Sequence, residues 1–391
     1  DAGGVVRLLG IAEALARRGH DVHMLAKFRA RGTELSLVGA LSDRLGGAPV
    51  EVFGASNFPA PGGPVHAAGR WAYSLATRTP PWVWTAYSRT LAARAKAVAP
   101  SFDVALLMDD HAHTFALDLE GLVPTVLDMQ NVMAASWNST NHWSGSGAPT
   151  AAQRVQQAVA FRLVKAWEHR VSQAADAVIV TSADEAARFR EHHGYPCDWV
   201  GSAIDTPALL ADPPRAEPHV VWLGDHQYHA NVDGLLRFLR EGWRPLGERG
   251  LRLQVAGRNP GDELLALAAD LPGVDVLGFV PDLAPLLASA SAAVVPVWKG
   301  AGIKMKSLVL MGSGLPVAST TVGLEGIAAR DRVHARVADD PAGLATAIGE
   351  LVADRASGAA LGLAGRQLVL DDHTWNGVIP QVEAVLERVA R

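Results

Sequence analysis

A glycine turn followed by two lysines is the part of the chain best suited to bind an anion. The stretch VPVWKGAGIKMKSLVLMGSGLPVAST, 295–320, reads as an apolar strand, a turn with Gly300 and Gly302, a helix, a second turn and a second apolar strand. Such a turn presents unpaired backbone N–H groups at the positive end of the helix dipole, where phosphate usually binds. The sequence therefore predicts a phosphate site on the turn 300–303.

A second group of polar residues lies in LLMDDHAHTF, 106–115. Asp109, Asp110, His111 and His113 follow an apolar strand, and the strand ends of α/β proteins collect functional groups. Two carboxylates and two imidazoles could bind a metal, although their spacing matches no specific metal pattern. At least one of the two aspartates could instead cap a helix.

These groups need strands and helices to position them, and the pattern predicts parallel α/β layers. Apolar strand-like runs alternate with helix-length periodic segments along the chain. We expect strands in the first half at about 21–27, 49–53, 102–108, 124–128 and 176–181. In the second half we expect them at about 219–223, 251–256, 274–277, 292–297, 315–319 and 333–337.

The stretch from Trp199 to Pro218 is rich in proline and small residues and reads as a linker. After it, a strand at 219–223, the turn at Gly224 and a helix near 231–240 restart the pattern. This repetition predicts two Rossmann-like domains with a cleft between them, at 1–202 and 203–372. The segment 373–391 reads as an amphipathic helix broken near Pro380.

The first residues form a glycine turn, an amphipathic helix with Leu8, Ile11 and Leu15 on one side and closed by Gly19, and a strand from about residue 21. Such a turn normally follows a strand, so we expect a strand before Asp1. Residues 57–90 are rich in Pro, Trp and Tyr. They could line an acceptor site, touch a membrane surface, or form a helical excursion packed on the first sheet.

Composition limits the possible partners. The chain has 391 residues, 49% of them hydrophobic, and a net charge of −5 without a long basic run. This balance argues against nucleic acid as a partner. The single cysteine, Cys197, fits a reducing cytoplasm and is better explained as a small buried residue than as a reactive thiol. No apolar run is long enough to span a bilayer, which leaves peripheral membrane contact open.

Seven fragments, in order along the chain, resemble the retaining GT-B-fold glycosyltransferases called glycosyl transferases group 1. They are GG with RRGHDVHML near the start, LDMQNV at 127–132, ADAVIVTSADEAARF at 175–189, WLGDHQYHANVDGLLRFL at 222–239, VAGRNP at 255–260, DVLGFVPDLAPLLASASAAVVPV at 275–297 and GAGIKMKSLVLMGSGLPVASTTVGLEGI at 300–327. The resemblance implies an α/β GT-B fold, with an acceptor-binding N-terminal domain, a nucleotide-sugar-binding C-terminal domain and a last helix that returns to the first domain.

The resemblance also implies roles for individual residues. The donor diphosphate would bind the loop of Gly300, Ala301, Gly302 and Ile303, and Lys304 or Lys306 would neutralise its charge without a metal or a cofactor. One of these lysines could instead point to solvent, because positions two apart on a helix do not share a face. Other donor contacts implied by the matching motifs are Gly3, Gly4, Gly224, Asn231, Arg258, Val280 and Glu325, the last of which could be only a solvated loop acid. A histidine near the strand end touches the donor sugar in relatives, so His111, His113 and the adjacent Asp110 are the catalytic candidates.

Three departures from the family pattern bear on activity. Many relatives have two glutamates, with seven residues between them, where this chain has Ala301 and Val309, and the second glutamate binds the ribose hydroxyls. The usual arginine and lysine after the first strand of the donor domain are replaced by GDHQYHAN, where His226, Tyr228 and His229 could supply substitute contacts. The usual Asn-Gly-Val-Asp type of turn at the linker reads Ser-Ala-Ile-Asp at 202–205.

The sequence as a whole predicts a cytoplasmic, retaining, metal-independent transferase that moves a hexose-type sugar from a nucleoside diphosphate to a small-molecule, lipid or glycan acceptor. Its composition suits a high-GC bacterium and envelope or natural-product glycosylation. The alternative is a non-catalytic relative with a degenerate donor site. A GT-B epimerase or phosphorylase stays open, whereas a nicotinamide-dependent oxidoreductase is disfavoured because GAGIKM lacks the third glycine of that fingerprint.

Overall fold

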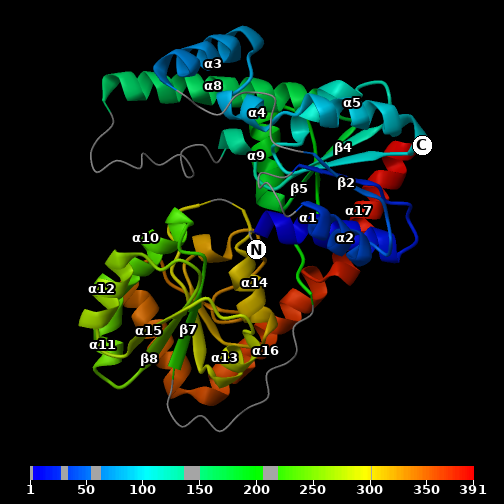
Figure 1. Ribbon diagram of the computed structural model, residues 1–391. Coiled ribbons are helices and arrows are strands. Elements are labelled where there is room, and N and C mark those ends of the chain that lie inside the picture. Colours follow the sequence, from blue (N-terminus) through cyan, green and yellow to red (C-terminus); the bar gives the residue numbers. More distant parts are fainter. Residues whose placement is uncertain (1–2, 28–33, 54–62, 136–149, 206–218, 301) are drawn as a thin grey trace. The chain divides into compact units, whose positions relative to one another are not determined.

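The computed structural model describes residues 3–27, 34–53, 63–135, 150–205, 219–300 and 302–391 (Figure 1). The chain forms two compact units. The first unit comprises residues 1–201 together with 378–391, and the second comprises residues 202–377. All strand pairs within the sheets of both units are parallel, as the alternation of strands and helices predicts.

The second unit is built on a six-stranded sheet with the order β12-β11-β10-β7-β8-β9. The strand order reverses between β7 and β10, so the loops after these two strands meet at the switch point where doubly wound sheets bind ligands. The strands are β7 (His219–Leu223), β8 (Arg252–Ala256), β9 (Val274–Gly278), β10 (Ala292–Val295), β11 (Val317–Ser319) and β12 (Arg336–Val337).

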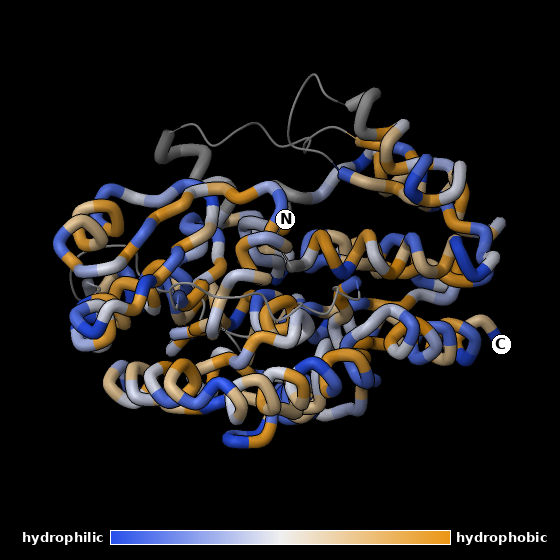
Figure 2. Tube along the Cα trace, turned by 90° about the horizontal axis from the view of Figure 1, so that it is seen from below, coloured by the Kyte–Doolittle hydropathy of each residue, from blue (hydrophilic) through white to orange (hydrophobic). Residues whose placement is uncertain are grey.

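Helices cover both faces of this sheet, because its central strands are apolar on both sides. Val220 and Trp222 of β7 belong to one buried cluster, whereas Val221 and Leu223 belong to the other. Apolar and polar residues alternate along the helices of the chain (Figure 2). Several helices surround this sheet. These are α10 (His229–Phe238), continued by a π-helical turn (Leu239–Trp243) and α11 (Arg244–Gly247), then α12 (Asp262–Asp270), α13 (Ala284–Ser289), α14 (Met305–Gly312), α15 (Pro341–Ala353) and α16 (Arg355–Asp372).

The first unit contains a two-stranded sheet, β1-β2, and a four-stranded sheet, β3-β4-β5-β6. Its strands are β1 (Met24–Lys27), β2 (Val50–Phe53), β3 (Ala105–Met108), β4 (Thr125–Met129), β5 (Ala177–Val180) and β6 (Asp198–Trp199). The predicted linker should not begin at Trp199, because Trp199 belongs to β6, which pairs with β5. The helices include α1 (Gly3–Arg17), α2 (Glu34–Arg44), α5 (Arg89–Val98), α6 (Ala116–Leu119), α8 (Ala151–Ala174) and α9 (Ala183–His193).

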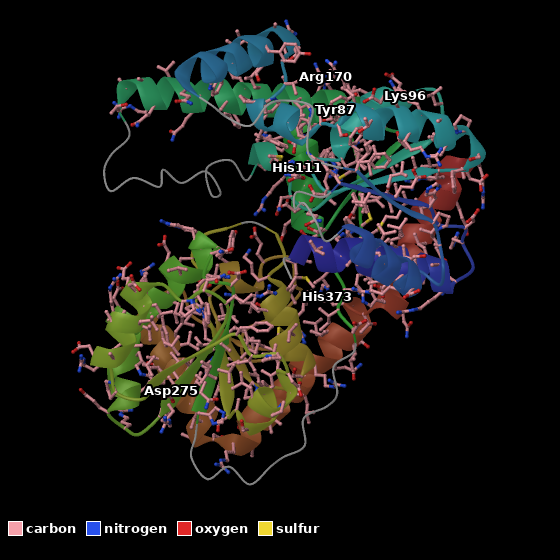
Figure 3. All side chains as sticks on the ribbon, viewed as in Figure 1. Tyr87, Lys96, His111, Arg170, Asp275 and His373 are labelled. Atoms are coloured by element: carbon pink, nitrogen blue, oxygen red, sulfur yellow. The ribbon has the colours of Figure 1, made fainter. Side chains whose placement is uncertain are left out.

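The aromatic-rich region after β2 is helical where the structure describes it, as α3 (Gly63–Thr77) and α4 (Pro81–Ala86). Residues 57–62 of that region lie outside the described residues. The Arg170 guanidinium of α8, labelled in Figure 3, donates to the Thr77 carbonyl and to the Thr79 hydroxyl, which fixes the end of α3. Trp82 of α4 packs edge-on against Trp167 of α8, with ring centroids 5.2 Å apart.

Two predicted local structures are wrong. Gly3 and Gly4 lie in the first turn of α1 rather than in a separate glycine turn. The last helix, α17 (Trp375–Ala390), continues through Pro380 without a break. Proline in the second turn of a helix removes one backbone hydrogen bond, and α17 also buries apolar residues on one side. These are Val378, Ile379, Val382 and Val385.

The helices and the single cysteine allow two further sequence-based expectations to be compared with the structure. Among the described residues, the structure has no helix that is both long enough and apolar enough to cross a membrane.

Cys197 is half-buried against the core cluster of the first unit, and this burial raises the pKa of its thiol to about 12. The thiol therefore stays protonated at neutral pH, in agreement with the interpretation of a structural cysteine.

Candidate functional site

The loop between β10 and α14 lies at the switch point of the second unit's sheet. Gly300 and Gly302 have φ angles of +119° and +71°, a region that side chains with a Cβ rarely adopt. The loop also lies close to α10, since a Cβ on Gly234 would be 1.9 Å from the Pro296 carbonyl oxygen. Ala301 lies outside the described residues.

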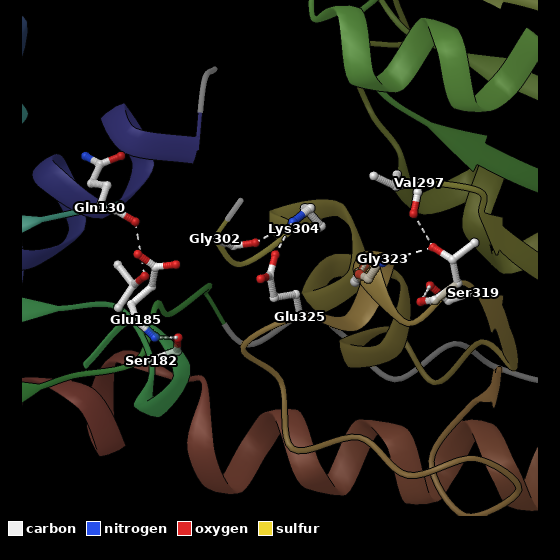
Figure 4. Close-up of polar contacts among 12 residues, drawn as sticks. Gln130, Ser182, Glu185, Val297, Gly302, Lys304, Ser319, Gly323 and Glu325 are labelled. Carbon is white, nitrogen blue, oxygen red and sulfur yellow. Dashed lines mark hydrogen bonds and ion pairs between the residues drawn. The ribbon is translucent and has the colours of Figure 1, made fainter. Parts of the chain in front are cut away.

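Lys304 is buried directly before the first residue of α14, in contrast to the alternative in which it points to solvent. Its Nζ donates to the Gly302 carbonyl oxygen at 2.6 Å and to Glu325 Oε2 at 3.2 Å (Figure 4). The Lys304 and Glu325 side chains are 8% and 17% exposed, so Glu325 is more than a solvated loop acid. This pair holds the phosphate-loop candidate against the turn at 322–325.

Lys306 reaches from the first turn of α14 to the first turn of α10 and to β7. Its Nζ lies 2.8 Å from Asn231 Oδ1 and 4.9 Å from the centre of the Trp222 ring. Desolvation, with a smaller contribution from the Lys304 charge, lowers the pKa of Lys306 to about 7. Two recessed lysines therefore lie in one small region, where Glu325 pairs with Lys304. An anion bound there would relieve the repulsion between the two lysines.

His226 in the loop after β7 is a buried imidazole. It is 8% exposed and stacks on Trp222, with ring centroids 5.1 Å apart. Neither ring nitrogen has a hydrogen-bond partner among the described residues. Desolvation lowers its pKa, so the ring is neutral and has one donor and one acceptor available at neutral pH.

Glycines allow this loop to approach its neighbours. A Cβ on Gly224 would lie 2.5 Å from the Trp222 ring, and one on Gly257 would lie 1.7 Å from the Gly224 carbonyl oxygen. The Tyr228 hydroxyl would be 3.2 Å from a Cβ on Gly300, so it borders the glycine loop. Burial, and then the Glu325 charge, raises the pKa of Tyr228.

The remaining predicted donor residues make contacts of other kinds. The Arg258 guanidinium lies 5.1 Å from the centre of the Phe279 ring, beside Val280, which packs on the core. His229 instead forms an exposed ion pair with Asp233 at 3.3 Å. Val309 on α14 also packs on the core, where it offers no polar group.

The second candidate group follows β3 in the first unit. Asp109 has a φ of +82°, a strained conformation for a non-glycine residue, and its carboxylate accepts a hydrogen bond from the His111 backbone N–H. This contact lies within the turn, so Asp109 does not cap a helix. The His111 ring packs edge-on against Trp82 with centroids 5.2 Å apart.

Asp110 and His113 are recessed beside each other. Burial, and then the charge of Asp109, raises the pKa of Asp110 to about 8, although 30% of its side chain is still exposed. His113 Nδ1 lies 3.9 Å from Asp110 Oδ1, while its Nε2 contacts the Asp128 carbonyl oxygen at 3.2 Å. Burial lowers the pKa of His113, so both groups tend toward their neutral forms. Among the described residues, no three His, Cys, Asp or Glu side chains are arranged to hold a metal ion.

Sequence reasoning missed a buried ion pair beneath this group. Arg7 of α1 binds both carboxylate oxygens of Asp128 and donates to the Gly201 carbonyl oxygen at 2.7 Å. Both side chains are 1% exposed. An arginine on the apolar face of α1 and an aspartate inside the strand LDM were the available signals.

A second missed feature is the support of the loop after β4. Glu168 of α8 accepts hydrogen bonds from the backbone N–H groups of Met133 and Ala134, while Glu185 of α9 accepts one from Val132. His193 Nε2 lies 3.0 Å from Glu168 Oε2. Gly4 approaches the same loop, because the Gln130 amide donates to its carbonyl oxygen at 3.3 Å.

Two family sequence models match the chain. Residues 2–198 match the glycosyl transferase 4-like domain, and residues 217–354 match the glycosyl transferases group 1. None of the curated proteins shows significant sequence similarity to the chain.

Three solved structures of similar fold come from three organisms. HepE from Anabaena, solved with UDP and glucose, has a TM-score of 0.67 and 16% identity, over 99% of this chain and 96% of HepE. Sucrose-phosphate synthase from Thermosynechococcus elongatus has a TM-score of 0.64 and 18% identity, over 94% and 99% of the two chains. A glycosyltransferase from Rickettsia africae has a TM-score of 0.68 and 12% identity, over 100% and 96%. The fold is therefore GT-B.

Proposed function

Because this chain belongs to the GT-B glycosyltransferases, with a 4-like domain followed by a group 1 domain, we propose that it transfers a hexose-type sugar from a nucleoside diphosphate to an acceptor. We further propose that transfer retains the anomeric configuration and needs no metal. Retention rests on the family resemblance. Independence from metal rests on the two lysines, which supply positive charge beside the glycine loop.

The single observation that carries the proposal is the state of Lys306. A lysine with a pKa near 7, recessed beside Lys304, is unfavourable unless the site receives negative charge. A diphosphate at the start of α14 would meet Lys304, Lys306 and the helix dipole together. Such a site also accepts the charge that develops on the leaving diphosphate as the bond to the sugar breaks.

The nucleoside part of the donor has fewer side-chain contacts available. HepE was solved with UDP and with UDP-glucose, which makes UDP the first candidate to test on this chain. We propose that His226, whose two ring nitrogens have no partner in the part of the chain that the structure describes, and the nearby Asn231 add contacts to the donor. We assign sugar handling to His111, with Asp110 and His113 as recessed neutral groups in support.

The alternative function is that of a non-catalytic binding protein with a degenerate donor site, and Val309 is the observation that favours it. Hydrogen bonds to a charged group contribute ~1.5–3 kcal/mol, so the missing ribose-binding glutamate would weaken the donor complex about ten- to a hundredfold. Val309 packs on the core and offers no replacement.

Thermal shifts with UDP, GDP, ADP, CDP and dTDP separate the two functions. A ligand at ~100 times its dissociation constant stabilises a protein by about 2.7 kcal/mol. We expect one diphosphate to stabilise the wild type and Lys306→Met to weaken its binding about ten- to a hundredfold. Lys299→Met is the matched control, because Lys299 is an exposed lysine of the same loop.

The outcomes point in opposite directions. Selective stabilisation by one diphosphate, lost in Lys306→Met and kept in Lys299→Met, supports the transferase. No response to any diphosphate in the wild type, with a response only in Val309→Glu, supports the binding protein. With the matching nucleotide sugar, analysis of the product and its anomeric configuration then distinguishes a retaining transferase from an epimerase or a phosphorylase.

A further inference from the structure

His111, to which we assign sugar handling, is an exposed histidine that follows β3 (Figure 3). Its backbone is held in place, because the His111 N–H donates to Asp109 Oδ1 at 2.9 Å and Asp109 keeps a φ of +82°. A fixed backbone does not determine the two side-chain torsions of the imidazole. An exposed ring that points in one direction therefore needs a neighbour that limits these torsions.

Trp82 of α4 is such a neighbour. The His111 and Trp82 rings pack edge-on, with centroids 5.2 Å apart and planes inclined by 65°. Aromatic pairs prefer edge-on or offset arrangements with centroids roughly 4.5–7 Å apart. Trp82 comes from the aromatic-rich region 57–90, so the contact joins that region to the candidate histidine.

Core packing alone does not explain a tryptophan at this position. Val83, the next residue of α4, is 1% exposed and belongs to the same apolar cluster as Trp167. Trp82 instead packs at the edge of this cluster and is half-buried. A tryptophan that only fills the core would be expected inside the cluster. The edge position of Trp82 brings its ring to His111.

Trp167 of α8 fixes the orientation of Trp82. The two rings pack edge-on with centroids 5.2 Å apart, and Trp167 is fully buried. The Trp167 Nε1 also donates to the Thr114 hydroxyl at 3.1 Å. Thr114 lies in the short 3₁₀-helix His113–Phe115. One buried tryptophan therefore supports both candidate histidines, the first through Trp82 and the second through the short helix.

We infer that Trp82 is a positioning residue for His111 and keeps the imidazole directed to one place. This role rests on the proposed function, in which His111 handles the sugar. A misplacement of about 1 Å in a catalytic site can cost up to about a hundredfold in rate. Loss of the Trp82 ring should therefore slow transfer, whereas binding of the diphosphate, which we assign to the second unit, should not change.

Nuclear magnetic resonance tests the ring contact without any measurement of activity. An aromatic ring shifts the resonances of protons packed against it, and His111→Gln identifies the His111 ring protons by their loss. In Trp82→Ala these resonances should move to the position of an exposed histidine, whereas Trp82→Phe should keep part of the shift. Trp199→Ala is the matched control and should leave them in place, because Trp199 is 53% exposed on β6 of the same unit.

Steady-state kinetics test the consequence, with the nucleotide sugar that matches the stabilising diphosphate. Trp82→Ala should lower kcat about tenfold or more and leave the Kd of the diphosphate unchanged, while Trp82→Phe should restore most of kcat. Trp199→Ala should keep kcat. In a His111→Gln background, Trp82→Ala should have little further effect, because a residue that acts only through His111 then has no ring to position.

The two readouts separate the positioning role from the proposed function. His111 resonances that stay in place in Trp82→Ala, or losses of kcat that add fully in the double variant, would overturn the role. If Trp82→Ala unfolds, Trp82→Leu fills the same space without an aromatic ring, and a kcat equal to that of Trp82→Phe would overturn it as well. Absence of transfer by the wild type with every nucleotide sugar would overturn the proposed function, and the resonances would then decide whether Trp82 holds the His111 ring.

Discussion

At the scale of single residues, the position of Lys306 couples ligand binding to protons. Because its pKa is about 7, roughly half of the side chains are neutral at pH 7 and most are neutral at pH 8. A bound diphosphate favours the charged form, so binding at pH 8 should take up close to one proton per site, and less at pH 6. Calorimetric titration in two buffers of different ionisation enthalpy measures this uptake.

The matched variants make the assignment specific. Lys306→Met should abolish the uptake, whereas Lys299→Met should keep it. Without ligand, the direction in which stability changes with pH is also defined. The folded pKa lies below the unfolded value of 10.5, so Lys306 makes stability rise between about pH 7 and pH 10.5, and Lys306→Met should flatten this rise. A rise of the same size in the variant would contradict a recessed, partly neutral lysine.

Asp110 gives the opposite pH dependence. Its folded pKa of about 8 lies above the ordinary 3.8, so the folded state keeps a proton that the unfolded chain releases. The resulting cost is complete above about pH 8 and disappears as the pH falls toward 4. We expect Asp110→Asn to stabilise the protein on the order of 1–2 kcal/mol at pH 8.5, after allowance for partial exposure, and to be nearly neutral at pH 4.5.

Urea unfolding at the two pH values checks the prediction. Asp103→Asn is the control, since Asp103 is an exposed aspartate shortly before the same strand, β3. An equal effect of Asp110→Asn at both pH values would contradict a protonated carboxyl and would favour a simple contact effect.

At the scale of elements, α8 supports the loop after β4 through one carboxylate. Glu168 accepts two backbone hydrogen bonds from this loop and contacts His193, and it is 1% exposed. Glu168→Ala should leave these donors buried without an acceptor and lower the free energy of unfolding by about 3 kcal/mol. Denaturant unfolding measures the loss.

Two further variants serve as comparisons for Glu168→Ala. Glu191→Ala, an exposed glutamate on α9, should change stability by less than about 0.5 kcal/mol. Glu168→Gln keeps an oxygen acceptor and should fall between the two. A loss below about 1 kcal/mol for Glu168→Ala would mean that water replaces the carboxylate.

Several elements of the fold could be predicted from the sequence, and one could not. The central strands β7 and β10 of the second unit were predictable because they are apolar on both faces and are followed by turns that contain glycine. The glycine loop was predictable because Gly300 and Gly302 adopt positive φ angles that glycine favours. The continuous helix through Pro380 was not, because buried contacts of the helix outweigh one lost backbone bond.

Long-range contacts explain what the sequence could not provide at the site. Lys304 binds Glu325, Lys306 binds Asn231, and His226 stacks on Trp222. The first two contacts join positions 21 and 75 residues apart in the chain, and no local pattern specifies them. The site roles of these residues stay predictions until ligand binding is measured.

At the scale of the whole molecule, the residues after the second unit complete the first. Residues 378–391 belong to the first unit, and Val378, Ile379, Val382 and Val385 are buried. Burial of one such side chain contributes ~1.5–3 kcal/mol, so removal of 378–391 should cost about 6–12 kcal/mol. A loss of this size is comparable to the whole stability of a domain.

Hydrogen exchange shows where the effect of the truncation falls. Peptides of residues 1–201 should lose protection, while peptides of residues 219–377 should keep it. Removal of only Ala390 and Arg391, which are exposed, is the control and should change neither set. Loss of protection in both units at once would mean that they unfold together.

The arrangement of the two units also sets an order for folding during synthesis. The second unit is one continuous stretch, 202–377, so it has all of its residues as soon as that stretch leaves the ribosome. The first unit emerges earlier but lacks α17 until residues 378–391 follow. Nascent chains usually complete their N-terminal domain first. Here the second unit can reach its native state while the first unit still lacks α17 and exposes the apolar surface that this helix covers. The first unit is therefore the part that a chaperone would need to protect.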